Sequence, residues 1–383
     1  MEKYVCPICG NEDPRYIGYK NGLPYCRRCI SFQGKHADLS YVPKENLRLK
    51  LTYPLSEKQQ EVSSKVLTLL INNKNALIHA VTGAGKTELV YASMERYLLE
   101  RKHVGFATPR KDVVIDLVPR VEEAFPDAKV VAVYGEHTSV LNGDIILLTT
   151  HQLYRYAHYF DLLILDEIDA FPYKDNALLN HFFYESVKGN YVLLSATPST
   201  EDINNINKDR GEVVSLYERY HHHALPLPVF IKKNYYAAIF YVIGKVKQYK
   251  KENKPVFIFV PTIQEGKKLY AMLSLLVKGG SFVSSKEESR RLDIERFKQG
   301  ELSYLVTTSI LERGVTVRNL QVIVFMADDD IYNQATLVQI AGRVGRKINA
   351  TSGEVIFLGQ SESSAIKEAI YEIARYNKKA HLL

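Results

Sequence analysis

Short aliphatic segments recur along the chain and narrow its fold more than any other feature. They span residues 76–80, 104–108, 130–133, 145–148, 162–165 and 191–194, and then 256–260, 302–307, 322–325 and 355–358. Runs of this kind are typical of parallel strands that are buried on both faces. Intervening stretches such as 88–101 suit the crossover helices that join parallel strands. The sequence therefore predicts an α/β protein.

The spacing of these runs predicts how the chain is divided into domains. A length of 383 residues allows two to three domains at ~150 residues each. We expect a cysteine-containing ribbon at 1–40, one α/β lobe at 41–205, a hinge at 206–232 and a second lobe at 233–383. The hinge contains His221, His222 and His223, which we interpret as a solvated polar turn rather than a metal site.

Composition sets limits on the class of protein. Hydrophobic residues make up 46% and charged residues 24%, which argues against a disordered chain. No run approaches the ~18 apolar residues of a membrane span, and the N-terminus lacks a secretory signal, so a cytoplasmic location is expected. The net charge of +7 fits a polyanionic partner, but it also fits a protein that charge merely keeps soluble.

All four cysteines fall within the first 29 residues, as two C-x2-C pairs formed by Cys6 with Cys9 and by Cys26 with Cys29. This spacing is typical of a zinc site in which two tight knuckles complete a tetrahedron of thiolates. Four thiolates leave no open position, so the metal would be structural. Two disulfides or a redox dithiol are the alternatives, but a cytosolic location disfavours disulfides, and a redox motif leaves one pair unexplained. Basic and aromatic residues between the pairs fit either nucleic-acid contact or a solvated surface.

A phosphate-binding loop is predicted directly after the first aliphatic run. The candidate nucleotide-binding residues are Ala80, Val81, Thr82, Gly83, Ala84, Gly85, Lys86 and Thr87. Glycines let backbone amides approach phosphate, the lysine adds a cation, and the threonine hydroxyl suits Mg²⁺. The first glycine of the usual G-x4-G-K-[ST] pattern is alanine here. Taken alone, the motif also fits a kinase, a GTPase or a transporter.

Acidic residues follow the run 162–165 and suit nucleotide hydrolysis. We expect Asp166 to hold Mg²⁺ through water, and Glu167 to orient and deprotonate the attacking water. An acidic loop without catalytic function is the alternative. Asp169 is expected either at the site or bonded across to the segment 195–197.

Together with further short motifs, these residues occur in the same order as the motifs of the superfamily 2 helicases and translocases, which the chain resembles. They are Gln59, 80–87, 108–110, 166–169, 195–198, 260–262, 307–308 with 312–314, and 339–346. The resemblance covers residues from about 55 to 360 and implies two tandem RecA-like lobes, with ATP and Mg²⁺ as cofactors. It also implies that Gln59 recognises adenine, that Gly314 links nucleotide and strand, and that Gln339, Arg343 and Arg346 face the γ-phosphate.

Within that superfamily the chain resembles the ComFA family, the late competence DNA translocases of naturally transformable bacteria. The resemblance rests on the N-terminal cysteine ribbon, on the sequence Asp-Glu-Ile-Asp-Ala-Phe-Pro at 166–172 and on Leu-Glu-Arg-Gly-Val-Thr at 311–316. It implies single-stranded DNA as substrate. It also implies two partners at the import site, a membrane DNA channel and a phosphoribosyltransferase-like competence protein, with the chain held at the inner membrane face through them.

Three hypotheses for the activity remain open on the sequence. The first is an ATP-driven motor that pulls single-stranded DNA, the second a replication-restart or repair helicase that opens duplex, and the third a scaffold whose ATP site only switches partner affinity. A motor needs Lys86 and Arg346 on one triphosphate, which requires closure of the two lobes. It also needs a grip on phosphates and sugars that ignores base identity. The candidate contacts are Thr108, Arg110, Thr149, Thr150, His151, Thr262, Thr307 and Thr308, although strand packing or a turn explains each threonine as well.

Overall fold

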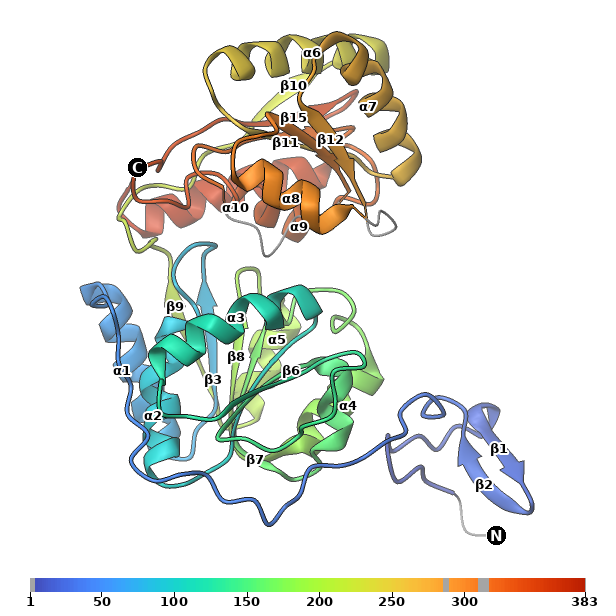
Figure 1. The fold of residues 1–383 in the computed structure, drawn as a ribbon, viewed down its shortest axis with the longest axis vertical. Helices are drawn as coiled ribbons and strands as arrows, with labels where there is room; N and C mark the ends of the chain where they lie inside the picture. Colours follow the sequence, from blue (N-terminus) through green and yellow to red (C-terminus); the bar gives the residue numbers. More distant parts are fainter. Residues whose placement is uncertain (1–3, 285–288, 309–316, 383) are drawn as a thin grey trace. The chain divides into compact units, whose positions relative to one another are not determined.

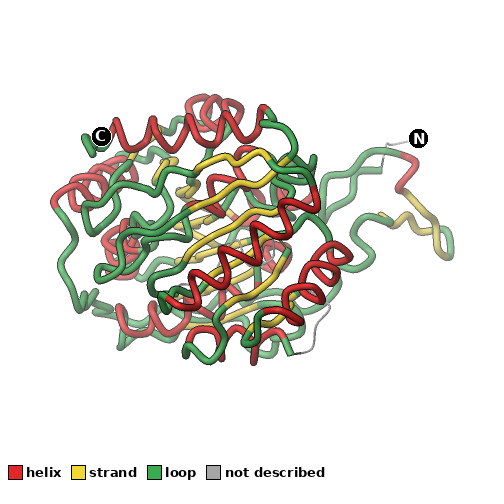
Figure 2. The backbone as a smooth tube through the Cα atoms, turned by 90° about the horizontal axis from the view of Figure 1, so that it is seen from above, coloured by secondary structure: helices red, strands yellow, loops and turns green. Residues whose placement is uncertain are grey.

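The protein is described from a computed structural model, which covers residues 4–284, 289–308 and 317–382. The chain divides into two compact units. One comprises Met1–Ala80 and Lys86–Leu216, and the other comprises Val81–Gly85 and Tyr217–Leu383. Both can be followed in Figure 1, and Figure 2 marks their helices in red and their strands in yellow.

A parallel seven-stranded sheet forms the centre of the first unit, with strand order β5-β6-β4-β7-β8-β3-β9. Its strands are β3 (Ala76–Ala80), β4 (Val104–Thr108), β5 (Val130–Val133), β6 (Ile145–Thr149), β7 (Phe160–Asp166), β8 (Val187–Ser195) and β9 (Glu212–Leu216). β3, β4 and β6 are buried at every position, which explains their unbroken apolar sequences.

Helices of the first unit pack on this sheet. They are α1 (Glu57–Ile71), η2 (Glu88–Val90), α2 (Tyr91–Leu99), α3 (Lys111–Ala124), η3 (Thr150–Arg155), α4 (Ala177–Ser186) and α5 (Thr200–Lys208). Side chains cap the starts of three of those described, α1, α4 and α5. Ser56 and Gln59 form a capping box at α1, and Ser199 and Asp202 form another at α5. Each box satisfies backbone amides that a helix start leaves without partners.

The second unit repeats the design with a parallel six-stranded sheet of order β10-β15-β14-β11-β13-β12. Its strands are β10 (Val229–Lys232), β11 (Val256–Phe259), β12 (Gly280–Val283), β13 (Tyr304–Thr307), β14 (Gln321–Phe325) and β15 (Val355–Gly359). Its helices are α6 (Tyr235–Lys251), α7 (Ile263–Leu276), α8 (Arg290–Lys298), α9 (Gln334–Ala341) and α10 (Ser364–Lys379). Two tandem parallel-sheet lobes confirm the predicted fold class.

A small hairpin near the N-terminus separates the two cysteine pairs, and Cys26 ends its second strand. It contains η1 (Pro14–Tyr16), β1 (Ile17–Lys20) and β2 (Leu23–Cys26), and the two strands are antiparallel. Asn21 and Gly22 have φ of 52° and 80°, the left-handed conformation that a tight hairpin turn requires.

Two strands lie inside the range 206–232 that we expected to be a hinge. β9 belongs to the first sheet and β10 to the second, so 217–228 is the stretch between the sheets. The prediction of a solvated turn is wrong for His221, which is only 6% exposed and whose Nε2 lies 2.9 Å from the carbonyl oxygen of Gly345. Within the described part of the chain, no helix combines the length and hydrophobicity that crossing a bilayer requires.

Candidate functional site

The predicted phosphate-binding loop leaves the carboxyl end of β3. Gly83 and Gly85 have φ of 82° and 75°, where a residue with a Cβ is strained. Lys86 Nζ donates a hydrogen bond to the carbonyl of Ala80 at 2.9 Å. Ala80 is a regular, fully buried strand residue without a positive φ, so alanine fits where the usual motif has glycine. Successive amides in such a loop make a concavity for phosphate.

A buried acid that the sequence analysis did not single out follows the loop. Glu88 is 6% exposed and accepts hydrogen bonds from Tyr53 Oη at 3.1 Å and from Arg120 Nη2 at 2.7 Å. These contacts attach the segment after Thr87 to helix α3 and to the connector before α1. In the sequence, only its position next to Thr87 could have indicated that Glu88 belongs to the site.

The two candidate catalytic acids end strand β7. Asp166 is the last strand residue, and its Oδ1 accepts a hydrogen bond from the backbone amide of Glu167 at 2.8 Å. Glu167 has a φ of 59°, a conformation that is uncommon outside glycine and is found at functional sites. Asp169 Oδ2 accepts from Thr197 Oγ1 at 2.7 Å, which is the second of the two placements expected for it.

Strand order brings the acids and the end of β3 to one edge of the first sheet. β8 lies between β3 and β7, with Ser195 opposite His79 and Leu194 opposite Asp166. All three strands are parallel, so their carboxyl ends point the same way. In open α/β sheets, ligands bind in this position.

Gln59 performs a structural task in the first unit. It is 6% exposed, and its Oε1 accepts from the backbone amide of Ser56 at 2.9 Å as part of the capping box. Adenine recognition by Gln59 therefore stays a prediction.

The candidate γ-phosphate residues of the second unit lie on α9 and the turn after it. Gln339 is 6% and Arg343 1% exposed, while Arg346 is partly exposed. Arg346 Nε donates to the carbonyl of Gly342 at 2.9 Å, which folds the side chain back over its own turn. Gly314 lies outside the described residues.

The candidate nucleic-acid contacts gather at the carboxyl ends of parallel strands. In the first unit, Thr108 ends β4 opposite Thr149, which ends β6. In the second unit, Thr307 ends β13 opposite Phe259 of β11. The remaining candidates are placed close by: Arg110 two residues after β4, Thr150 and His151 at the start of η3, Thr262 as the N-cap of α7 and Thr308 directly after β13.

Burial divides these candidates into two groups. Thr262 is exposed, and Arg110 and His151 are partly exposed, so their side chains can meet a ligand. Thr108, Thr149, Thr150, Thr307 and Thr308 are at most 8% exposed. The hydroxyl of Thr307 already donates to the carbonyl of Thr308 at 3.1 Å, so a ligand would reach this position through the backbone.

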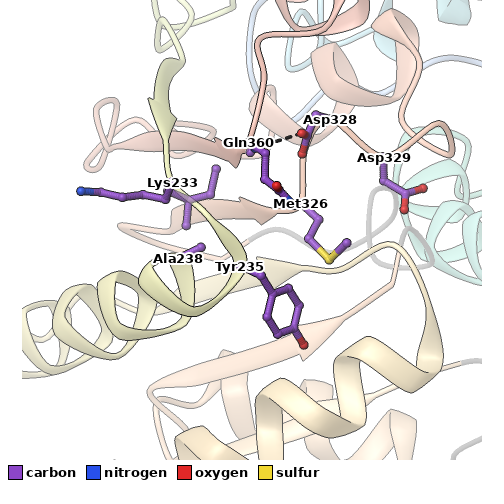
Figure 3. A pocket seen from close by; sticks show the side chains of 9 residues that line it. Lys233, Tyr235, Ala238, Met326, Asp328, Asp329 and Gln360 are labelled. Carbon is purple, nitrogen blue, oxygen red and sulfur yellow. Dashed lines mark hydrogen bonds between the residues drawn. The ribbon is translucent and has the colours of Figure 1, made fainter.

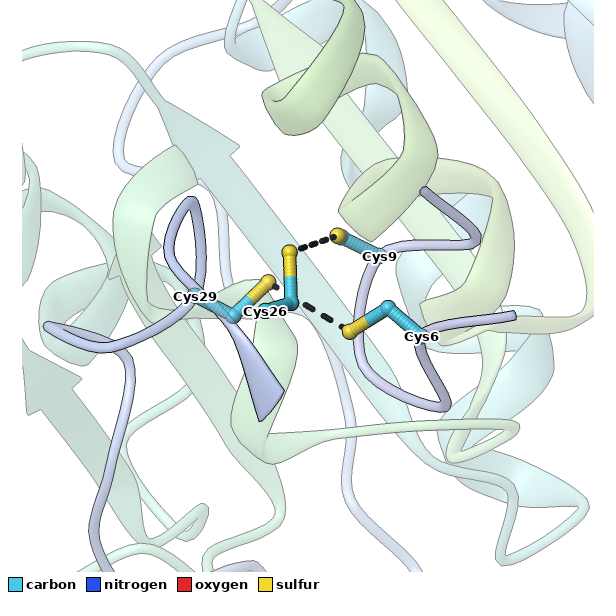
Figure 4. A group of neighbouring side chains, drawn as sticks. All are labelled: Cys6, Cys9, Cys26 and Cys29. Atoms are coloured by element: carbon cyan, nitrogen blue, oxygen red, sulfur yellow. Dashed lines mark hydrogen bonds between the residues drawn. The ribbon is translucent and has the colours of Figure 1, made fainter. Parts of the chain in front are cut away.

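The four cysteine sulfurs form one cluster (Figure 4), in which all four Sγ atoms lie within 4.8 Å of one another. Cys6 Sγ is 3.9 Å from Cys29 Sγ, and Cys9 Sγ is 3.7 Å from Cys26 Sγ. Four ligands at ~2.3 Å on the corners of a tetrahedron stand about 3.8 Å apart, so these residues fit zinc.

Burial raises the pKa of Cys9 to about 11 and raises the pKa of Cys29 further. Without a cation, these thiols would therefore stay protonated at neutral pH. A bound divalent ion ionises its thiols outright, which is the chemistry that zinc would supply here.

The segment that follows the cysteine pairs packs against η3 and α4 of the first unit. The ring of Phe32 lies 5.0 Å from Phe182 and stacks on His151 at 6.5 Å between centroids. Arg155 Nη1 donates to the carbonyl of Lys35 at 2.6 Å, and Tyr154 Oη donates to that of Gln33 at 3.0 Å. His151, a candidate nucleic-acid contact, is thus in direct contact with the exit of the ribbon.

A pocket of about 160 Å³ opens at the carboxyl ends of β10, β14 and β15 in the second unit (Figure 3). Its lining residues are Lys233, Tyr235, Ala238, Met326, Asp328, Asp329, Leu358, Gly359 and Gln360. Asp328 there accepts from the backbone amides of Gln360 at 2.9 Å and Ser361 at 3.1 Å, so it braces the loop after β15. The volume is below the ~300–1,000 Å³ of ligand sites, and no predicted nucleotide-binding residue lines it.

Two known protein families match this chain, one in each lobe. The family "Type III restriction enzyme, res subunit" matches residues 52–200, and the "Helicase conserved C-terminal domain" matches residues 237–347. Among solved structures, S. cerevisiae Dbp5 bound to RNA and ADP BeF3 has a TM-score of 0.64 at 16% identity, over 84% of this chain and 91% of that one. The fold is thus that of a helicase core.

Curated relatives extend the comparison to the whole chain. Competence protein ComFA of Streptococcus pneumoniae is 35% identical over 99% of this chain and 92% of its own length, and that of Bacillus subtilis is 34% identical over 99% and 86%. Replication restart protein PriA of Rickettsia prowazekii is 28% identical over 47% of this chain and 30% of its own length. The chain is a helicase-type enzyme that hydrolyses ATP, and it belongs to the ComFA family of competence proteins.

Proposed function

We propose that this protein is an ATP-driven motor that moves along single-stranded DNA and drives the import of transforming DNA. The observation that carries the proposal is its likeness to competence proteins over 99% of the chain. PriA proteins match over less than half of the chain, which favours the import motor over a replication-restart helicase.

The proposed nucleotide chemistry uses the residues at the carboxyl edge of the first sheet. Amides of the loop around Gly83 and Gly85, together with Lys86, would hold the phosphates. Thr87 and Asp166 would hold Mg²⁺, which neutralises charge on the β- and γ-phosphates. Glu167 would position water and accept its proton. Arg346 would act as the arginine finger, with Gln339 and Arg343 beside it.

The proposed grip on DNA relies on strand ends, where hydroxyls and amides contact a sugar-phosphate backbone without reading bases. Thr262, Arg110 and His151 are accessible enough to do so through their side chains. Thr262 also caps α7 by accepting from the amide of Glu265 at 3.2 Å, and the positive end of a helix attracts phosphate. ATP binding would favour one arrangement of the protein and hydrolysis would release it, and this alternation would move the strand stepwise in one direction.

Steady-state ATP hydrolysis with and without single-stranded DNA tests the proposal. We expect strong stimulation in the wild type and near-complete loss in Lys86→Ala and Arg346→Ala. Lys58→Ala is the matched control, because Lys58 is an exposed helix lysine whose one ion pair among the described residues is with Glu61. Stimulation by RNA alone would overturn the assignment to DNA.

A second assay separates translocation from unwinding. A motor should displace streptavidin from the end of a biotinylated single strand when ATP is present, and it should separate a blunt duplex poorly. Efficient duplex separation would instead support the restart or repair helicase. ATP binding without turnover stimulated by nucleic acid would support the scaffold.

A further inference from the structure

The segment after β9 is bonded to the turn that carries Arg346. Three consecutive residues, Arg219, Tyr220 and His221, direct their side chains at backbone carbonyls of 342–346. The bonds are Arg219 Nη2 to Gly342 O at 3.1 Å, Arg219 Nη1 to Val344 O at 2.8 Å and Gly345 O at 2.9 Å, Tyr220 Oη to Arg346 O at 2.9 Å, and His221 Nε2 with Gly345 O at 2.9 Å.

Arg219 dominates this set of bonds. It is 1% exposed, and it forms no ion pair with any Asp or Glu among the described residues. Burial, with the nearby charge of Arg346, lowers the pKa of Arg219 to about 9, so it is still a cation at neutral pH. A buried cation that is satisfied by carbonyls is stable only while those carbonyls keep their positions.

Arg219 and Arg346 share one acceptor. The carbonyl of Gly342 accepts from Arg219 Nη2 at 3.1 Å and from Arg346 Nε at 2.9 Å. The guanidinium of Arg219 therefore fixes the same oxygen that orients the side chain of Arg346.

The segment is also anchored on both sides of Arg219 to helix α10. Tyr217 stacks on Tyr376 with 5.5 Å between ring centroids. Further along, Leu225 and Asn377 exchange two hydrogen bonds, at 2.8 and 2.9 Å. Tyr217 directly follows Leu216, the last residue of β9, so the chain that leaves the first sheet is held from its first residue onward.

We propose that Arg219 is a positioning residue for ATP hydrolysis, which holds the turn 342–346 in the shape that aims Arg346 at the transferring phosphate. The inference rests on the proposed role of Arg346 as arginine finger. A misplacement of about 1 Å at such a group costs on the order of 10²-fold in rate, so a device that fixes the turn has a measurable kinetic effect.

The test compares Arg219→Lys with Arg375→Lys, alone and in an Arg346→Ala background. Lysine keeps the charge of Arg219 but lacks the fork that reaches four carbonyls, those of Gly342, Val344 and Gly345 and, through Nε at 3.1 Å, that of Thr82. Arg375 belongs to the same unit but pairs with Glu372 on α10, so it controls for the substitution itself. For Arg219→Lys we expect kcat of stimulated hydrolysis to fall about 10–100-fold, with KM for ATP within about 2-fold. Arg375→Lys should retain the wild-type kcat.

Coupling distinguishes positioning from a general structural effect. Once Arg346 is alanine, Arg219→Lys should change kcat by less than about 2-fold, because the group it positions is gone. Equal losses in both backgrounds, or an Arg219→Lys enzyme with wild-type kcat, would overturn the inference. Full activity of Arg346→Ala alone would instead overturn the finger assignment of the proposed function.

A second variant tests the proposal independently in case Arg219→Lys does not fold. Tyr220 is 39% exposed, so Tyr220→Phe removes only the bond to the carbonyl of Arg346. We expect about 2–5-fold lower kcat in the wild-type background and no change in the Arg346→Ala background. No loss in the wild-type background, or the same loss in both, would contradict the proposal.

Discussion

Replacing Gly345 with alanine should separate the stability of the second unit from its catalytic geometry. Gly345 has a φ of 70°, where an alanine costs about 1 kcal/mol. A Cβ built there stands 2.3 Å from the carbonyl oxygen of Thr351, and real Cβ contacts stay above 3.0 Å. The turn must therefore move by at least 3.0 − 2.3 = 0.7 Å.

That movement would act on the group next in sequence. The carbonyl of Gly345 accepts from Arg219 and His221, so a displaced turn loses these bonds and moves Arg346. We expect Gly345→Ala to lower the free energy of unfolding in urea by roughly 2 kcal/mol. We also expect it to lower the kcat of DNA-stimulated ATP hydrolysis about 10²-fold.

Gly300→Ala provides the matched control. Gly300 has a φ of 82° in the same unit, but nothing lies within 4 Å of its added Cβ. It should lose about 1 kcal/mol of stability while kcat stays within 2-fold of wild type. Equal kcat values for the two variants would refute the reasoning, because only Gly345→Ala displaces the turn.

Three further outcomes follow from other parts of the molecule. Cys26→Ser should lower zinc from about one ion per chain to near zero by elemental analysis, and unchanged metal content would exclude the cluster as the site. Burial opposes ionisation of Asp161, but hydrogen bonds from His103 hold its pKa at about 2. Because this folded pKa lies below the unfolded ~3.9, ionised Asp161 should contribute about 2 kcal/mol to the free energy of unfolding at pH 7 and progressively less below pH 4. In urea unfolding, the stability of Asp161→Asn should therefore approach that of the wild type towards pH 2. A difference in stability that stays constant with pH would argue against ionisation as the cause. Phe32→Ala removes the ring contact with Phe182 and should speed proteolysis within residues 1–40 while the two lobes keep their melting temperature; unchanged cleavage would show that this ring does not anchor the ribbon.

The strands that could be predicted from sequence are those with continuous aliphatic segments. β3 and β4 match their predicted bounds of 76–80 and 104–108, since every residue in them is buried. β9, β10 and β12 were missed, and all three are edge strands with exposed or polar positions. An edge strand loses burial on one side, and in these three the sequence lacks the unbroken apolar run on which the prediction depended. β5 is also an edge strand, but it keeps the apolar run Val130–Val133 and was predicted.

The candidate site shows the same contrast. Asp166, Lys86 and the cysteine pairs were predicted because their residue types and spacings are set by the groups they would bind. The burial of Thr108 and Thr150 was not predicted, since threonine suits both a strand end and a ligand contact. Sequence spacing alone does not decide between these roles.

Arg219 lies at the limit of what a sequence shows. A residue that binds phosphate must have a particular chemistry at a particular offset from a strand, which leaves a motif. A residue that braces a turn needs only donors that reach its carbonyls, and Arg219 reaches Gly342 from 123 positions away in the chain. Its neighbours in the sequence give no information about its partners in space. For this reason the sequence analysis predicted a polar hinge for the segment that contains Arg219 and His221. For the motor proposed above, residues that fix catalytic turns are therefore expected in stretches that a motif search passes over.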